Sequence, residues 1–208
     1  MAINFPGSPT LNQVFIDSGK TWKWDGSSWV ALRSPLTSPE NTPVIATGST
    51  TARTLANRFA DVVNVLDFGA DPTGVTDSVQ SIRNAINFAK AKGGGVILFP
   101  AGTYKVTETS LYNGFTCHFP IENANFIDFV GYGAVLNSTA SSASLFYLNG
   151  CRRINFEGFD IVGTFSRTGS VVNTYSISCF DLNSTTRDSE QISIKNCRTQ
   201  YTYVFIRV

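Results

Sequence analysis

The chain has 208 residues, a formal net charge of +1, and only 15% charged residues. This length allows one domain of ordinary size and a small additional module. So little charge gives no electrostatic footprint for nucleic acid or an anionic membrane, and the chain shows neither a secretory signal nor a long apolar span. We therefore expect no nucleic-acid partner and no membrane insertion.

The cysteine and histidine content predicts neither a metal site nor a cofactor. The chain has four cysteines without a C-x-x-C pair, and His118 is the single histidine. Zinc sites use closely spaced thiolates or imidazoles, so buried reduced thiols are the simpler interpretation. The glycine run at Gly93 follows a predicted helix, whereas a phosphate-binding loop would open one.

Residues 1–33 form an aromatic module. Asp25-Gly26 separates two short apolar segments, which is a strong hairpin signal, and the alternation around it predicts a three-stranded β-meander. So small a sheet cannot bury enough surface to be stable alone, and aromatic side chains concentrate at interfaces. We expect the interface residues to be Phe5, Phe15, Trp22, Trp24 and Trp29.

Two connecting regions follow the module. Residues 34–50 are rich in proline, serine and threonine, a composition typical of a linker. Residues 51–61, which contain Leu55 and Phe59, are predicted to form a short helical neck.

The segment after Val62 predicts a strand, a helix and a second strand. Apolar residues recur at helical spacing between Ser78 and Lys92, with Asp77 as the expected N-cap and Gln80 completing a capping box. Glycines end this helix, and residues 96–99 then form a short, continuously apolar strand. A helix in this position suits the cap of a solenoid, because terminal repeats must cover an open core.

A weak internal repeat appears beyond Tyr104. The pattern Ile-x-Phe-x-Gly at Ile127 recurs 27 residues later at Ile154, and a related pattern follows after a further 38 residues at Ile192. Repeats of this length, each built from short strands, are typical of a solenoid. Alternation along the strands then separates the side chains into two groups. The inward positions are Ile127, Phe129, Ile154, Phe156, Ile192 and Ile194, and the outward columns are Asp128, Asn155 and Ser193, then Val130, Glu157 and Lys195.

Two sequence segments carry a family resemblance. Residues 54–65 run directly into Asp67-Phe68-Gly69-Ala70, and the glycine run at 93–95 leads into Pro100-Ala101-Gly102-Thr103-Tyr104. This order resembles the start of the pectate-lyase-like β-helix of bacteriophage tailspikes and tail fibres, and residues 1–33 resemble the modules that attach such fibres to the virion. The implied fold is mainly β: a small N-terminal meander, a short helical neck, and from 62 to 208 the first part of a right-handed parallel β-helix capped by one α-helix.

The same resemblance implies a function and its partners. We expect a homotrimeric structural or adhesion component of a phage tail, located in the virion after assembly in the host cytoplasm. Its N-terminus would bind other tail or virion proteins, and its β-helix would bind host-surface polysaccharide. Residues 201–208 read as a further strand without a cap, so we also expect either a longer natural chain or another element that closes this end.

The alternative is a polysaccharide depolymerase, hydrolase or lyase, with its site here or on a missing C-terminal part. Glycoside hydrolysis uses two carboxyl groups roughly 5 to 10 Å apart. The outward-facing candidates are Asp128, Glu157, Asp160 and Asp181. A surface ion pair with Lys195 explains Glu157 equally well. We therefore assign no catalytic residue within these 208 residues.

Overall fold

The chain contains two compact units, Met1–Ala60 and Asp61–Val208, which are described separately. The computed structural model describes residues 3–17, 20–32, 41–140, 143–163, 178–181, 189–200 and 204–207. In 178–181 and 204–207 the description covers the backbone only. No helix among these residues is long and apolar enough to cross a membrane.

The N-terminal unit begins with the predicted β-meander, which is confirmed. Strands β1 (Val14–Asp17), β2 (Lys20–Trp24) and β3 (Trp29–Leu32) form an antiparallel sheet in that order. The turn between β2 and β3 is held by Asp25, whose carboxylate accepts hydrogen bonds from the backbone N–H groups of Ser27 and Ser28. These bonds lower the pKa of Asp25 to about 2.

The rest of this unit contains a hairpin and a short helix. Strands β4 (Pro43–Ile45) and β5 (Ala52–Thr54) pair in antiparallel fashion, and α1 (Leu55–Phe59) follows directly. The Thr54 hydroxyl caps α1 by accepting a hydrogen bond from the Asn57 N–H at 3.2 Å. The segment predicted as a helical neck therefore contains a strand as well as a helix, and the sequence analysis did not anticipate the β4–β5 hairpin.

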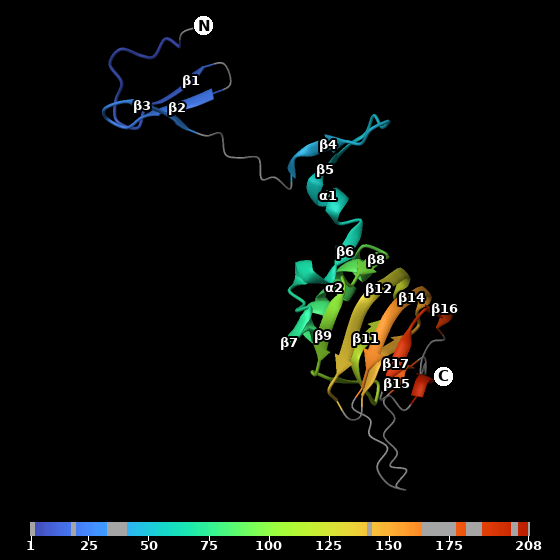
Figure 1. The fold of residues 1–208 in the computed structure, drawn as a ribbon. Helices are drawn as coiled ribbons and strands as arrows, with labels where there is room; N and C mark the ends of the chain where they lie inside the picture. Colours follow the sequence, from blue (N-terminus) through green and yellow to red (C-terminus); the bar gives the residue numbers. More distant parts are fainter. Residues whose placement is uncertain are drawn as a thin grey trace. The chain divides into compact units, whose positions relative to one another are not determined.

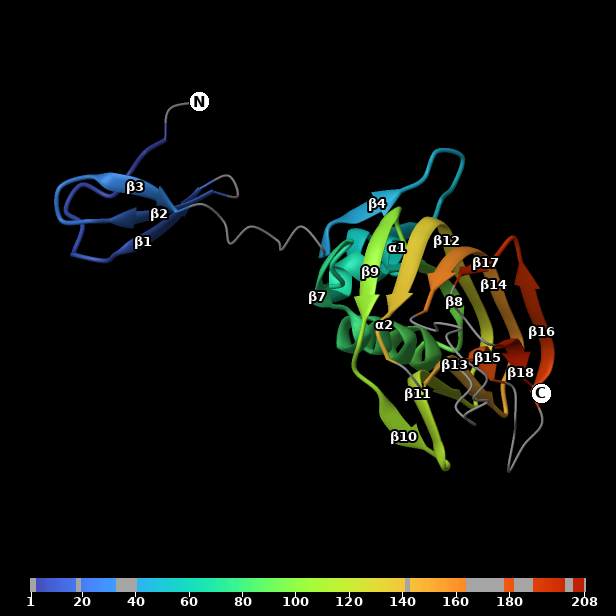
Figure 2. The same cartoon turned by 60° about the horizontal axis from the view of Figure 1, so that its bottom comes forward.

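The second unit is a parallel β-helix, which confirms the predicted fold class. Figure 1 shows β8, β12 and β14 side by side, and Figure 2 shows the same strands from another side. The largest sheet contains β6 (Val62–Asn64), β7 (Thr73–Asp77), β8 (Gly95–Leu98), β9 (Gly102–Val106), β12 (Asn125–Ser138), β14 (Arg152–Val162), β16 (Glu190–Lys195) and β17 (Arg198–Gln200). The facing sheet contains β10 (Ser110–Tyr112), β11 (Phe115–Glu122), β13 (Ser144–Asn149), β15 (Ser178–Asp181) and β18 (Val204–Arg207). A short 3₁₀ helix, η2 (Val65–Phe68), follows β6.

The register inferred from the internal repeat is correct. Ile127 of β12 lies opposite Ile154 of β14, which in turn lies opposite Ile192 of β16. Ile127 and Ile154 are fully buried, and Ile192 is half-buried against the same core. Equivalent side chains therefore stack from one turn of the solenoid to the next.

Phenylalanines fill the core between the two sheets. The Phe129 and Phe156 rings stack with their centroids 4.6 Å apart and an interplanar angle of 12°. Phe146, from the facing sheet, contacts both rings, with centroid distances of 5.7 and 4.7 Å. The aromatic column thus joins neighbouring strands and also joins the two sheets across the core.

The helix α2 (Val79–Ala91) covers the first strands of the β-helix, as predicted for a cap. It buries a stripe made of Val79, Ile82, Ala85, Ile86 and Ala89. The predicted capping box is wrong, because Ser78 is the N-cap and Gln80 donates to Asn84 at 3.0 Å. Asp77 accepts from the backbone N–H of Val79, the first residue of α2, at 3.3 Å, and also from those of Thr107 and Glu108 at 3.1 and 2.9 Å. Its carboxylate therefore joins the start of the helix to the chain that follows β9.

One corner of the solenoid is built from residues in the left-handed backbone region. Phe126, Arg153 and Gln191 occupy equivalent positions and have φ values of 58°, 55° and 56°. Gly94, with φ of 126°, lies at the start of this corner, where a Cβ atom would approach the Phe126 carbonyl oxygen to 2.4 Å. Glycine is required at that position because the backbone of the next turn leaves no space for a side chain.

His118 is buried in a polar network beside α2. Its Nδ1 donates to the Glu108 carbonyl at 2.7 Å, so Nε2, 2.9 Å from the Ser138 hydroxyl, accepts from it in the neutral ring. Burial lowers the pKa of His118, and the nearby Arg83 acts in the same direction. The hydrogen bond to Glu108 and the charge of Asp77 act in the opposite direction. Above pH 6.5 the folded protein therefore holds this imidazole in its neutral form.

The phenylalanine column predicts a large effect of truncation. Phe156→Ala should lower the free energy of unfolding by about 3–5 kcal/mol, because Phe156 is fully buried and its removal leaves a cavity. Urea denaturation measures this change. The control Leu111→Ala, at a side chain that is 75% exposed, should change it by less than about 0.5 kcal/mol. Equal effects of the two substitutions would contradict the assignment of the core.

The environment of His118 predicts a loss of stability in acid. Because its pKa is lower in the folded state than the ordinary value of 6.5, the unfolded chain binds a proton first. Above pH 6.5 His118 does not lower the stability of the folded protein. As the pH falls below 6.5, protonation of His118 in the unfolded chain lowers the free energy of unfolding. Nuclear magnetic resonance can follow this single imidazole directly during a pH titration. A ring that titrates at or above 6.5 in the folded protein would show that the network does not exclude the charged form.

Candidate functional site

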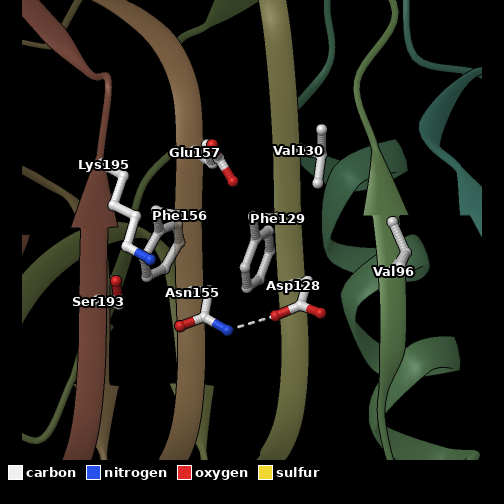
Figure 3. A pocket seen from close by; sticks show the side chains of 9 residues that line it. All are labelled: Val96, Asp128, Phe129, Val130, Asn155, Phe156, Glu157, Ser193 and Lys195. Atoms are coloured by element: carbon white, nitrogen blue, oxygen red, sulfur yellow. Dashed lines mark hydrogen bonds between the residues drawn. The ribbon is translucent and has the colours of Figure 1, made fainter.

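The outer face of the largest sheet carries two rows of side chains, most of them polar. Asp128, Asn155 and Ser193 lie opposite one another on β12, β14 and β16, as the sequence register predicted. The next row contains Val130, Glu157 and Lys195, and Figure 3 shows both rows crossing the strands. In-register parallel pairing places these residues in rows because equivalent positions face the same side of the sheet.

A shallow groove of about 260 Å³ lies over these rows. Its lining comes from four neighbouring strands, and the backbones of two core phenylalanines contribute to its floor. The lining residues are Val96, Asp128, Phe129, Val130, Asn155, Phe156, Glu157, Ser193 and Lys195. Polar groups therefore surround an open surface above a rigid aromatic core.

Both carboxylates in the groove are held by neutral hydrogen-bond donors. The Asn155 amide donates to Asp128, and the dashed line in Figure 3 marks this bond. The Tyr132 hydroxyl donates to Glu157, and the Asn196 amide also reaches Glu157 at 3.4 Å. The bond to Glu157 raises the pKa of Tyr132 above its ordinary value, so the phenol remains a donor.

Tyr132 reaches Glu157 because β12 is irregular at this point. The pairing of β12 with β14 shifts between Val130 and Ala134. The Tyr132 ring lies over Gly158, where a Cβ atom would be only 2.8 Å from the ring. Tyr132 and Asn196 were not among the residues predicted from the sequence. The available signal was an exposed aromatic residue between two glycines directly after a predicted strand, which is typical of a bulge.

The ion pair considered for Glu157 is absent from the described part of the structure. Glu157 and Lys195 are neighbours in the register, but no salt bridge between them is found there. In Figure 3 the Lys195 amine points toward the row that contains Asn155. The bonds from Tyr132 and Asn196, and not Lys195, therefore account for the position of Glu157.

The other two carboxylate candidates lie elsewhere. Asp160 forms a bidentate ion pair with Arg198, with both contacts at 2.7 Å, which lowers the pKa of Asp160. It does not line the groove. Asp181 belongs to β15 in the facing sheet, and its side chain lies outside the described part of the structure. Only Asp128 and Glu157 of the four are brought together.

The backbone positions of these two carboxylates are near enough to be compared with the carboxyl pair of a glycoside hydrolase. Asp128 and Glu157 lie on adjacent strands and are offset by two residues, which puts their Cα atoms about 8 Å apart by strand geometry. Hydrolases place their two carboxyl groups at roughly 5 to 10 Å. Both groups accept hydrogen bonds from neutral donors, Asp128 from Asn155 and Glu157 from Tyr132. This arrangement does not distinguish a general acid from a base or nucleophile.

The five residues predicted to anchor the N-terminus lie together in the meander. The Phe5 ring stacks on Trp29 at 5.3 Å and meets Trp22 edge-on at 5.1 Å. Phe15 and Trp24 also contact Trp29, at 5.9 and 5.7 Å. All five are half-buried and face one another. The opposite face of the sheet exposes aliphatic side chains, namely Val14, Ile16, Val30 and Leu32.

Within the described ranges, no group of three or more histidine, cysteine, aspartate or glutamate side chains is placed to hold a metal ion. Cys151 and Cys197 are free thiols. Burial raises the pKa of Cys151 and of Cys197, which keeps both in the unreactive protonated form.

Known proteins share parts of this chain and its fold. Alpha-1,3-galactosidase A of Peterkaempfera griseoplana is 40% identical over 77 residues, which are 36% of this chain and 10% of that protein. The A-module of the mannuronan C-5 epimerase AlgE6 of Azotobacter vinelandii has a TM-score of 0.53 at 18% identity, covering 69% of this chain and 39% of the module. The tailspike protein of E. coli bacteriophage HK620, in complex with a pentasaccharide, has a TM-score of 0.45 at 16% identity, covering 77% of this chain and 34% of the tailspike.

The chain spans about a tenth of the galactosidase and well under half of the epimerase module. At 18% identity, the likeness to the epimerase module shows a common fold only. The family model described as "Rhamnogalacturonase A/epimerase, pectate lyase-like" matches residues 62–202, which contain the whole groove. The chain therefore belongs to the rhamnogalacturonase A/epimerase, pectate lyase-like family.

Proposed function

We propose that this protein is a structural and adhesion component of a phage tail that binds host-surface polysaccharide through the groove on its β-helix. The groove over β8, β12, β14 and β16 is the observation that carries this proposal. In this proposal the protein is assembled in the host cytoplasm and is then located in the virion as part of the tail.

The groove has the chemistry that a glycan needs. Sugar hydroxyls both donate and accept hydrogen bonds, and the groove offers an amide at Asn155, a hydroxyl at Ser193 and an amine at Lys195. Asp128, Asn155 and Ser193 recur at the strand spacing of about 4.8 Å, so a polymer lying across β12, β14 and β16 meets a polar group from each of these three strands. Strands rather than loops hold them, which favours binding without reorganisation.

The N-terminal module is proposed to attach the protein to other tail or virion proteins. Phe5, Phe15, Trp22, Trp24 and Trp29 would act by holding the sheet together, since their rings contact one another. The aliphatic face on the other side of the sheet would then contact the partner. An exposed face with four aliphatic side chains supports this assignment.

A homotrimer is proposed because the N-terminal unit has too little core of its own. None of its described residues is fully buried. Phe59, at the end of α1, is 73% exposed, and Ile45 of β4 is 61% exposed. Association of three copies would cover these side chains and supply the missing burial.

Depolymerisation of the bound polysaccharide is the second candidate function. The placement of Asp128 and Glu157 on adjacent strands favours it, because glycoside hydrolysis uses two carboxyl groups that lie near one another. Incubation of the protein with polysaccharide would reveal depolymerisation through newly formed reducing ends or unsaturated products.

The glycan proposal predicts a groove-specific loss of binding. With a panel of O-antigen and capsular polysaccharides, the full chain should bind at least one polymer in calorimetry, and Asn155→Leu should weaken that binding at least about tenfold. Asn137→Leu makes the same chemical change on β12 outside the groove and should leave affinity unchanged. If no polymer binds, or if the two variants behave alike, the groove is not a glycan site. Release of reducing ends would establish the second function.

The trimer proposal predicts the mass of the full chain in solution. Light scattering at micromolar concentration should give three times the chain mass of 22.6 kDa. Phe59→Asp should shift the protein toward the monomer, whereas Leu111→Asp, at another exposed apolar position, should not. A wild-type monomer at this concentration would contradict the proposal.

A further inference from the structure

We propose that the groove selects uncharged glycans and rejects polyuronates, because Asp128 and Glu157 present two fixed negative charges to the bound chain. This inference rests on the proposed glycan binding and adds the class of polymer that the groove accepts. It follows from the charges in the groove and from the partners that hold them.

The charge of the groove is set by three side chains. Asp128 and Glu157 contribute negative charges, and Lys195 contributes one positive charge. The local balance is therefore negative, although the whole chain carries a formal net charge of +1. Like charges that meet across an interface oppose binding, so the local balance decides which ligands enter.

The hydrogen-bond partners of both carboxylates are neutral groups. Asp128 accepts from the Asn155 amide, and Glu157 accepts from the Tyr132 hydroxyl and the Asn196 amide. None of these donors cancels the negative charge, since none is a cation. An ion pair would have neutralised a carboxylate, as Arg198 does for Asp160 outside the groove.

The single positive charge of Lys195 cannot neutralise the repulsion that both groove carboxylates exert on a polyuronate. A polyuronate carries one carboxylate on every sugar, so a chain that lies across the strands would place successive negative charges over β12, β14 and β16 together. The amine of Lys195 could bind one of these groups on β16, while the others would approach Asp128 and Glu157. An uncharged chain suffers no such repulsion, and its hydroxyls can donate to both carboxylates.

The experiment compares polymers and charge variants of the full chain. Polygalacturonate and alginate serve as polyuronates, and they are tested at low salt, where surface charges act most strongly, beside the neutral polymer found in the polysaccharide panel. The wild type should bind the neutral polymer and neither polyuronate. Asp128→Asn/Glu157→Gln should gain polyuronate binding by at least about tenfold, because it removes two repulsive contacts. Adding Lys195→Met to that variant should abolish the gain.

A matched control separates local from overall charge. Asp17→Asn/Asp67→Asn makes the same change in net charge at residues that do not line the groove, and it should gain nothing. Circular dichroism confirms that each variant is folded. If the wild type binds a polyuronate at least as tightly as the neutral polymer, this inference is overturned, while the proposed glycan binding stands. So would a groove variant that gains no more than the control. Failure of wild type and variants to bind any polymer would instead overturn the proposed function, and this inference with it.

Discussion

In-register stacking of side chains between successive turns is the constraint on which the β-helix depends. The Phe129 and Phe156 rings can stack at 4.6 Å only if β12 and β14 keep the same alternation of inward and outward positions. A slip of one residue would place Asp128 in the core and Phe129 in water. The core therefore fixes the register, and the register then fixes the rows of outward side chains that form the groove.

The register was predictable because it follows from a local pattern. The Ile-x-Phe spacing at Ile127 and Ile154 shows the period of two that a half-buried strand requires, and the distance between the two copies gives the length of one turn. Outward placement of Asp128, Asn155 and Glu157 follows automatically. Most residues of the candidate groove could thus be predicted from the amino-acid pattern, although that pattern does not show that the two rows enclose a depression.

Contacts that depend on irregular geometry were not predictable. Tyr132 meets Glu157 because the strand shifts register after Val130, and no periodic pattern encodes that shift. Asp77 was assigned to helix capping, and it does accept from the Val79 N–H, but no local rule predicts that it also accepts from the N–H groups of Thr107 and Glu108. The virion-anchoring role assigned to the tryptophans remains a prediction. Their rings pack against one another within the N-terminal module, and this packing does not test whether the module binds a partner.

The alternation along each strand also places structural constraints on the inward side chains and leaves the outward side chains largely free of them. Ile154 and Phe156 are constrained by neighbours above, below and across the core, whereas Asn155 and Glu157, between and beside them, project from the surface. Substitutions in the outward rows can therefore accumulate one turn at a time at little cost to folding. If the outward rows bind a polymer as proposed, their specificity can change by point mutation while the scaffold stays the same.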